Sequence, residues 1–188
     1  MKFELILRNV KVEYPSLYEA RGSIAVLLHL EKHVEEIAAI RNIVKMTKAE
    51  NKKLRRSATC LVGPSNTSWC PAEHLLLSCT ALPDKQIVVL DRDMSLMTLE
   101  NNKIMGGSVC NVKVQITTDD VNIYATVLAV QYVHAGCSCI NRTGRDSHYQ
   151  SYKIGDVDLL TLSGFKNLNF DVDYGKGDSI SRIMVLLG

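Results

Sequence analysis

Residues 107–136 read GSVCNVKVQITTDDVNIYATVLAVQYVHAG and predict two β-strands joined by a short turn. In the first half apolar and polar residues alternate, which is the pattern of a strand with one buried face. Residues 118–120 supply the turn, and the second half alternates again before becoming apolar on both faces at residues 128–130. Strand parity places Lys113 and Tyr124 together on the polar face, where a ligand could dock.

The composition predicts one domain with a substantial core. The chain has 188 residues and a formal net charge of +2, which neither favours nor excludes a polyanionic partner. A run of about 18 apolar residues, as a membrane span requires, is missing, and Glu4, Arg8 and Lys11 interrupt the apolar pattern of the N-terminus. We therefore expect a cytoplasmic protein that does not engage a membrane.

The six cysteines are expected to be reduced thiols, because the sequence carries no export signal. Cys137 and Cys139 form a C-x-C pair, while Cys60, Cys70 and Cys79 are spaced about ten residues apart. Neither arrangement has the C-x₂-C spacing of a structural zinc site. The sequence also shows no nucleophile motif, carboxylate pair or glycine-rich phosphate loop. We expect no metal, no cofactor and no enzymatic activity.

The first strand, over residues 2–13, changes the phase of its alternation. Phe3, Leu5 and Leu7 share one parity, whereas Val10 and Val12 share the other. Such a slip predicts a β-bulge or sharp bend near residues 8–9. The Tyr-Pro pair at residues 14–15 ends the strand. A second strand follows residue 22, with one face formed by Ile24, Val26, Leu28 and Leu30.

Residues 32–54 change to a helical period, with one apolar stripe formed by Val34, Ile37, Ile40 and Val44. Glutamates cluster at the start of this helix and basic residues at its end. The basic end continues through residues 52–56, Lys-Lys-Leu-Arg-Arg. Two interpretations stay open: the charges complement the helix dipole on a solvated face, or they form a basic patch that faces phosphates.

Further strands are expected over residues 75–81 and 86–90, and Asp91-Arg92-Asp93 predicts a turn. Trp69, the only tryptophan, is either a core residue or a stacking surface. Residues 137–156 have the composition of a loop or linker. Residues 157–188 form a C-terminal extension whose apolar ending predicts packing on the barrel or on another subunit.

Together these elements predict a β-rich α+β fold. The order of short strands, one amphipathic helix and a bent first strand favours a five-stranded Greek-key barrel of the OB type over residues 1–136. The C-terminal extension follows this barrel.

Three segments resemble a family of phage and prophage single-stranded DNA-binding proteins with an OB fold. They are NVKVEYPSLYE (residues 9–19), IVVLDRD (residues 87–93), and GGSVCNVKVQ (residues 106–115) followed by ATVLAVQYV (residues 125–133). The segments occur in the order found in that family and span about residues 1–136. The family tends to end in an acidic tail, whereas this chain ends in IMVLLG.

The resemblance implies binding of single-stranded DNA without sequence specificity, in phage DNA replication or recombination within the host cytoplasm. Such binding needs cations for the backbone and exposed aromatic rings for the bases. Each cation could equally be a solubilising charge, and Tyr132 could instead be a core residue. The candidates for phosphate contact are Lys11, Lys53, Arg55, Arg56, Arg92 and Lys113, and those for stacking are Tyr14, Trp69, Tyr124 and Tyr132.

An alternative function belongs to a different class. The chain could be a protein-interaction module that keeps the barrel and uses its apolar C-terminus, residues 180–188, to bind another protein or to form a homo-oligomer. The near-neutral charge and the missing acidic tail favour this alternative, and the basic run at residues 52–56 favours DNA.

Overall fold

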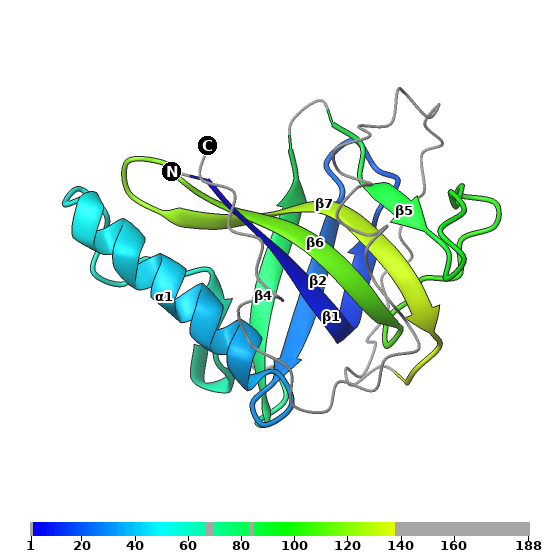
Figure 1. Ribbon diagram of the computed structural model, residues 1–188, viewed down its shortest axis with the longest axis horizontal. Coiled ribbons are helices and arrows are strands. Elements are labelled where there is room, and N and C mark those ends of the chain that lie inside the picture. Colours follow the sequence, from blue (N-terminus) through cyan, green and yellow to red (C-terminus); the bar gives the residue numbers. More distant parts are fainter. Residues whose placement is uncertain (1, 67–69, 83–84, 138–188) are drawn as a thin grey trace.

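A closed barrel of five strands forms the centre of the molecule in the computed structural model, which describes residues 2–66, 70–82 and 85–137 (Figure 1). The described elements are β1 (Phe3–Ser16), β2 (Ser23–His29), α1 (Val34–Glu50), β3 (Leu61–Val62), the short 3-10 helix η1 (Pro64–Asn66), β4 (His74–Ala81), β5 (Val88–Leu90), β6 (Val109–Thr118) and β7 (Ile123–His134).

The strand order is that of an OB barrel. Around the barrel the order is β1, β2, β4, β7, β6 and back to β1, with antiparallel neighbours except for the parallel β4–β7 pair that closes it. The two short strands extend the sheet, β3 beside β4 and β5 beside β7. The predicted fold class is confirmed, and the hairpin of residues 107–136 is the β6–β7 pair.

The predicted bulge in the first strand is present. The register of β1 against β6 shifts between Leu7 and Val10, and Asn9 has a φ of 51°. The first half of β1 pairs mainly with β6 and the second half with β2. Because the bulge restores the inward parity, Phe3, Leu5 and Leu7 and then Val10 and Val12 all enter one core.

A second bulge explains the apolar residues 128–130. Lys113 pairs with Ala129 and Val114 pairs with Val127, so Leu128 is the extra residue of β7. On the outer side of this region Ala129 packs with Val88 and Leu90 of β5. The strand is therefore buried on both faces where β5 lies beside it.

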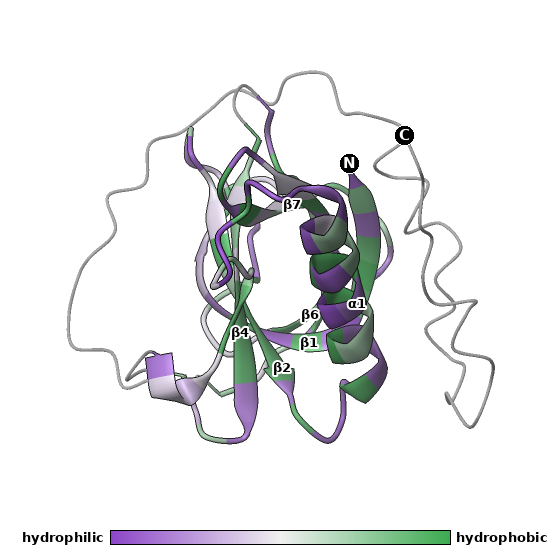
Figure 2. Ribbon diagram, turned by 90° about the vertical axis from the view of Figure 1, so that its left-hand side faces the viewer, coloured by the Kyte–Doolittle hydropathy of each residue, from purple (hydrophilic) through white to green (hydrophobic). Residues whose placement is uncertain are grey.

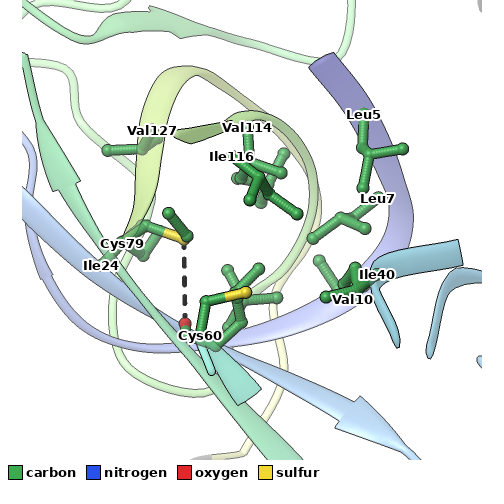
Figure 3. Close-up of a cluster of buried hydrophobic side chains, with 14 of the residues drawn as sticks. Leu5, Leu7, Val10, Ile24, Ile40, Cys60, Cys79, Val114, Ile116 and Val127 are labelled. Carbon is green, nitrogen blue, oxygen red and sulfur yellow. Dashed lines mark hydrogen bonds between the residues drawn. The ribbon is translucent and has the colours of Figure 1, made fainter. Parts of the chain in front are cut away.

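Helix α1 packs on the barrel through Ile37, Ile40 and Ile43, which belong to the main core. Figure 3 shows Ile40 beside Leu7 and Val10 of β1, and hydrophobic and hydrophilic residues alternate along the helix (Figure 2). The predicted stripe was wrong at Val34, which is 57% exposed because α1 begins at that residue.

Leu30 was predicted to share one strand face with three residues that are buried, and it is instead 42% exposed. It follows the last residue of β2, so the alternation of that strand no longer applies to it. Within β2 the prediction was right: Ile24, Val26 and Leu28 lie in the main core.

Several predictions fall on residues outside the described ranges: Trp69, the linker beyond Cys137, and the extension of residues 157–188 with its apolar end. Among the described cysteines, Cys60, Cys70, Cys79 and Cys110 are buried free thiols and Cys137 is an exposed one. In the described ranges no helix is long and apolar enough to cross a membrane, and no three His, Cys, Asp or Glu side chains are grouped as a metal site would require.

Candidate functional site

The chain makes a tight turn as it leaves α1, and this turn presents the predicted basic run. The side-chain Oδ1 of Asn51 accepts a hydrogen bond from the backbone N–H of Lys53 at 3.0 Å, and the N–H of Leu54 donates to the Asn51 carbonyl at 3.2 Å. Leu54 and Ala58 are buried in the main core. The backbone is thereby anchored, and the charged side chains of this basic segment are exposed: Lys52, Lys53, Arg55 and Arg56.

The β6–β7 turn holds an exposed tyrosine through the carboxylate of Asp119. Its Oδ1 accepts hydrogen bonds from the N–H groups of Val121 (2.7 Å) and Asn122 (2.6 Å). Its Oδ2 accepts one from the hydroxyl of Tyr124 at 2.5 Å. Asn122 Nδ2 donates to the same tyrosine oxygen at 3.2 Å. Tyr124 remains 45% exposed, so its ring is fixed at its edge and open to solvent.

The basic segment and the β6–β7 turn lie side by side. The backbone N–H of Arg55 donates to the carbonyl of Val121 at 3.2 Å, and Asn51 Nδ2 donates to the carbonyl of Asp119 at 3.4 Å. Figure 1 shows this hairpin turn beside the C-terminal end of α1. We call the surface formed by residues 51–56 and 119–124 the helix–hairpin surface. It unites four of the predicted site residues: Lys53, Arg55, Arg56 and Tyr124.

The helix–hairpin surface carries an excess of positive charge. Residues 51–56 and 119–124 include four basic side chains and two carboxylates, those of Asp119 and Asp120. The hydrogen bond from Tyr124 lowers the pKa of Asp119, and the two turn N–H groups and the charge of Arg55 lower it further. Asp119 is therefore ionised at neutral pH and partly offsets the cations around it.

Lys113 does not belong to this surface, and the prediction that it lies on the solvent side was wrong. Parity places it on the outer face of β6, but it is only 4% exposed and its Nζ lies 3.2 Å from Oε2 of Glu4. It pairs with Ile6 and Ala129, two residues of the apolar cluster on which β5 packs. Lys113 is thus a buried structural cation.

Tyr132 and Arg92 lie far from Tyr124. Tyr132 is half-buried and packs against the main core, in agreement with its alternative interpretation as a core residue. Arg92 is exposed on the predicted turn after β5, which Gln131 fastens by donating from Nε2 to the carbonyls of Asp91 and Arg92 at 3.5 and 3.4 Å. Gln131 and Tyr124 are separated by about 23 Å along β7.

Lys11 and Tyr14 lie at the other end of the barrel. Lys11 pairs with Val109, at the start of β6, whereas Tyr124 pairs with Thr117, near its end. Tyr14 is 51% exposed and has a φ of 47°. These two candidates therefore form no common site with the helix–hairpin surface.

Asn51 and Asp119 organise the surface and were not among the predicted site residues. The signal for Asp119 was present in residues 118–122, TDDVN, because an aspartate that accepts from backbone N–H groups two and three residues later is typical of a turn. The sequence carried no comparable signal for Asn51, since its amide acts on a residue 68 positions away.

Comparison with known proteins gives matches only at the level of structure. No protein-family model matches the sequence, and no curated protein matches it. Among solved structures, the single-stranded DNA-binding protein from bacteriophage Enc34 matches with a TM-score of 0.60 and 18% identity, over 77% of this chain and 87% of that one. The chain shares the fold of the Enc34 protein.

Two further structures of the Enc34 protein match as well. Its complex with single-stranded DNA gives a TM-score of 0.59 at 18% identity, covering 72% of this chain and 88% of the other. Its C-terminal truncation gives 0.58 at 17% identity, covering 72% and 87%. At this identity the likeness to the Enc34 protein concerns the fold, and the binding residues of this chain must be argued from its own geometry.

Proposed function

We propose that the protein binds single-stranded DNA without strong sequence preference, and that the helix–hairpin surface is a contact site for the strand. The observation that carries the proposal is the contact between the basic segment and the β6–β7 turn, where the N–H of Arg55 donates a hydrogen bond to the carbonyl of Val121. This contact brings exposed cations and an exposed aromatic ring together from segments 60 or more residues apart in the sequence.

The two kinds of side chain suit the two parts of a single strand. Lys53, Arg55 and Arg56 offer charge to the phosphates, and Tyr124 offers a ring on which a base stacks, an interaction that contributes about 1–3 kcal/mol. Backbone contacts and stacking are insensitive to base identity. The hydroxyl of Tyr124 is engaged with Asp119 and Asn122, which leaves the ring face as the main recognition element.

The fold supports the same function. OB barrels bind oligonucleotides on the face of their second and third strands and in the adjoining loops. In this chain those strands are β2 and β4, and the loop between the fourth and fifth barrel strands is the β6–β7 turn, next to Tyr124 at the start of β7. The structure of the Enc34 protein in complex with single-stranded DNA shows such binding for that protein.

Lys11, Tyr14 and Arg92 are proposed as secondary contacts. Lys11 lies beside β2 through its pairing with Leu27, and Arg92 is exposed on the turn after β5. Trp69 stays a predicted stacking residue outside the described ranges. Lys113 is not proposed as a DNA contact because it is buried. Tyr132 is not proposed either, because it packs on the core. We propose that the protein acts in phage DNA replication or recombination, in the host cytoplasm.

Fluorescence anisotropy with a labelled oligo-dT tests the proposal at several salt concentrations. We expect binding that weakens steeply with salt, and a logarithmic salt slope that is smaller by about 2 in the triple variant Lys53→Gln/Arg55→Gln/Arg56→Gln, since each phosphate contact on a single strand contributes about 0.7. The matched control is Lys32→Gln/Arg41→Gln/Lys45→Gln, which removes three exposed charges on and before α1.

The control separates a local contact from the charge of the whole molecule. We expect it to leave the affinity within about threefold of the native value, since exposed charges far from the strand are screened within about 10 Å at 0.1 M salt. Absence of binding at low salt would overturn the proposal. Equal weakening of the two triple variants would overturn the assignment to the helix–hairpin surface.

A further inference from the structure

We propose that Asp119 is a positioning residue that fixes the ring of Tyr124 as a stacking platform. This inference rests on the proposed function and names a residue that acts on the DNA only through another side chain. It starts from an anomaly, because a surface that binds phosphates would be expected to exclude a carboxylate. Asp119 nevertheless lies in the middle of the helix–hairpin surface, beside Arg55 and Tyr124.

Both oxygens of the Asp119 carboxylate are used within the protein. Oδ1 takes the N–H groups of Val121 and Asn122, and Oδ2 takes the hydroxyl of Tyr124. The carboxylate therefore ties the free end of an exposed side chain to the backbone of the turn. The same turn is held against the basic segment by two hydrogen bonds. Arg55 N–H donates to the carbonyl of Val121, and Asn51 Nδ2 donates to the carbonyl of Asp119.

Fixing the ring before the DNA arrives lowers the cost of binding. An exposed tyrosine that is free to rotate loses that freedom when a base stacks on it, and immobilising one such side chain reduces affinity by about 2–10-fold. In this protein the hydrogen bond to Asp119 restricts the ring in advance. The negative charge that this requires is partly offset by Arg55.

Two variants of Asp119 separate positioning from charge. In Asp119→Asn the side-chain oxygen can still accept from the turn N–H groups, and the amide can donate to the oxygen of Tyr124, so the lock is kept while the charge is lost. In Asp119→Ala both are lost. We expect Asp119→Asn to bind oligo-dT as tightly as the native protein or more tightly, and Asp119→Ala to bind about 5-fold more weakly than Asp119→Asn.

Two variants of Tyr124 then show whether Asp119 acts through that ring. Tyr124→Phe keeps the ring and removes the hydroxyl, so it should weaken binding by about the same 5-fold factor. Tyr124→Ala removes the platform. In the Tyr124→Ala background, Asp119→Ala and Asp119→Asn should bind equally, because the hydrogen bond to the tyrosine is absent from both and the turn bonds that Asp119→Ala also removes are made within the protein. Thermal unfolding of each variant verifies that the barrel is folded.

Three results would overturn the role of Asp119 while leaving the proposed function intact: Asp119→Ala binding as well as Asp119→Asn, Tyr124→Phe binding as well as the native protein, or the difference between the Asp119 variants persisting in the Tyr124→Ala background. The last would assign its effect to the turn backbone. Failure of the native protein to bind oligo-dT at low salt is a separate result, which would overturn the proposed function itself.

Discussion

Nζ of Lys113 lies 3.2 Å from Oε2 of Glu4, and this ion pair joins β6 to β1 on the outer face of the barrel. The side chain of Lys113 is 5% exposed and that of Glu4 22%. Gln115 adds a hydrogen bond from Nε2 to the other oxygen of Glu4 at 3.4 Å. A cation that looks from its parity like a DNA contact is therefore part of the scaffold.

Replacing Glu4 by alanine should destabilise the barrel strongly. This substitution removes the carboxylate that pairs with the buried Nζ of Lys113. Breaking a buried ion pair by removing one partner costs about 3 kcal/mol or more. Urea unfolding measures the loss. The double variant Glu4→Gln/Lys113→Met, which removes both charges, should recover most of the stability, and a double variant no more stable than Glu4→Ala would contradict this account.

Helix α1 should depend on Ile40 and not on Val34, although both belong to the apolar stripe predicted from the sequence. Ile40 is fully buried against β1, whereas Val34 is 57% exposed. Ile40→Ala should lower the free energy of unfolding by about 2–5 kcal/mol, and Val34→Ala should change it by less than about 0.5 kcal/mol. Equal effects in urea unfolding would show that α1 is seated differently on the barrel.

Stability should fall as the pH drops from 7.5 to 5.5. Burial lowers the pKa of His33 and of His74, and the nearby His29 and Lys11 lower that of His74 further. The unfolded chain therefore takes up protons near pH 6.5 that the folded chain does not, so the stability present above that pH is lost below it.

Unfolding in urea at a series of pH values measures this slope. His74→Gln should flatten it, and His134→Gln, at an exposed position, serves as the matched control. The ring of His74 lies 5.0 Å from that of His29, whose Nε2 is 3.6 Å from Glu73. A slope unchanged by His74→Gln would show that other groups control the pH dependence.

The described cysteines should differ sharply in reactivity. Cys137 is exposed, whereas Cys60, Cys79 and Cys110 are buried in the main core. Burial raises the pKa of Cys60 to about 11 and raises those of Cys79 and Cys110 as well, which suppresses the reactive thiolate. Peptide mapping after brief alkylation at pH 8 should find Cys137 modified and these three protected. Fast labelling of Cys79 in the native protein would contradict the packing described.

Local patterns were sufficient to predict most of the barrel. The phase change in residues 2–13 predicted the bulge now seen between Leu7 and Val10, and the alternation in residues 107–136 predicted the β6–β7 hairpin. Both depend on residues a few positions apart, where side-chain parity and turn chemistry act directly. The same logic failed at Val34 and Leu30, which lie just where their elements begin or end.

The sequence by itself determined the strand and helix periods, the bulge, the turns and the inventory of cations and aromatic residues. Only the tertiary structure decided which of them meet. Packing of β5 over Ala129 places Lys113 in an apolar environment, and closure of the barrel against α1 brings Arg55 to Val121, 66 positions away. These contacts depend on packing between segments far apart in the sequence, and the hydrophobic period of a single strand or helix carries no information about such packing.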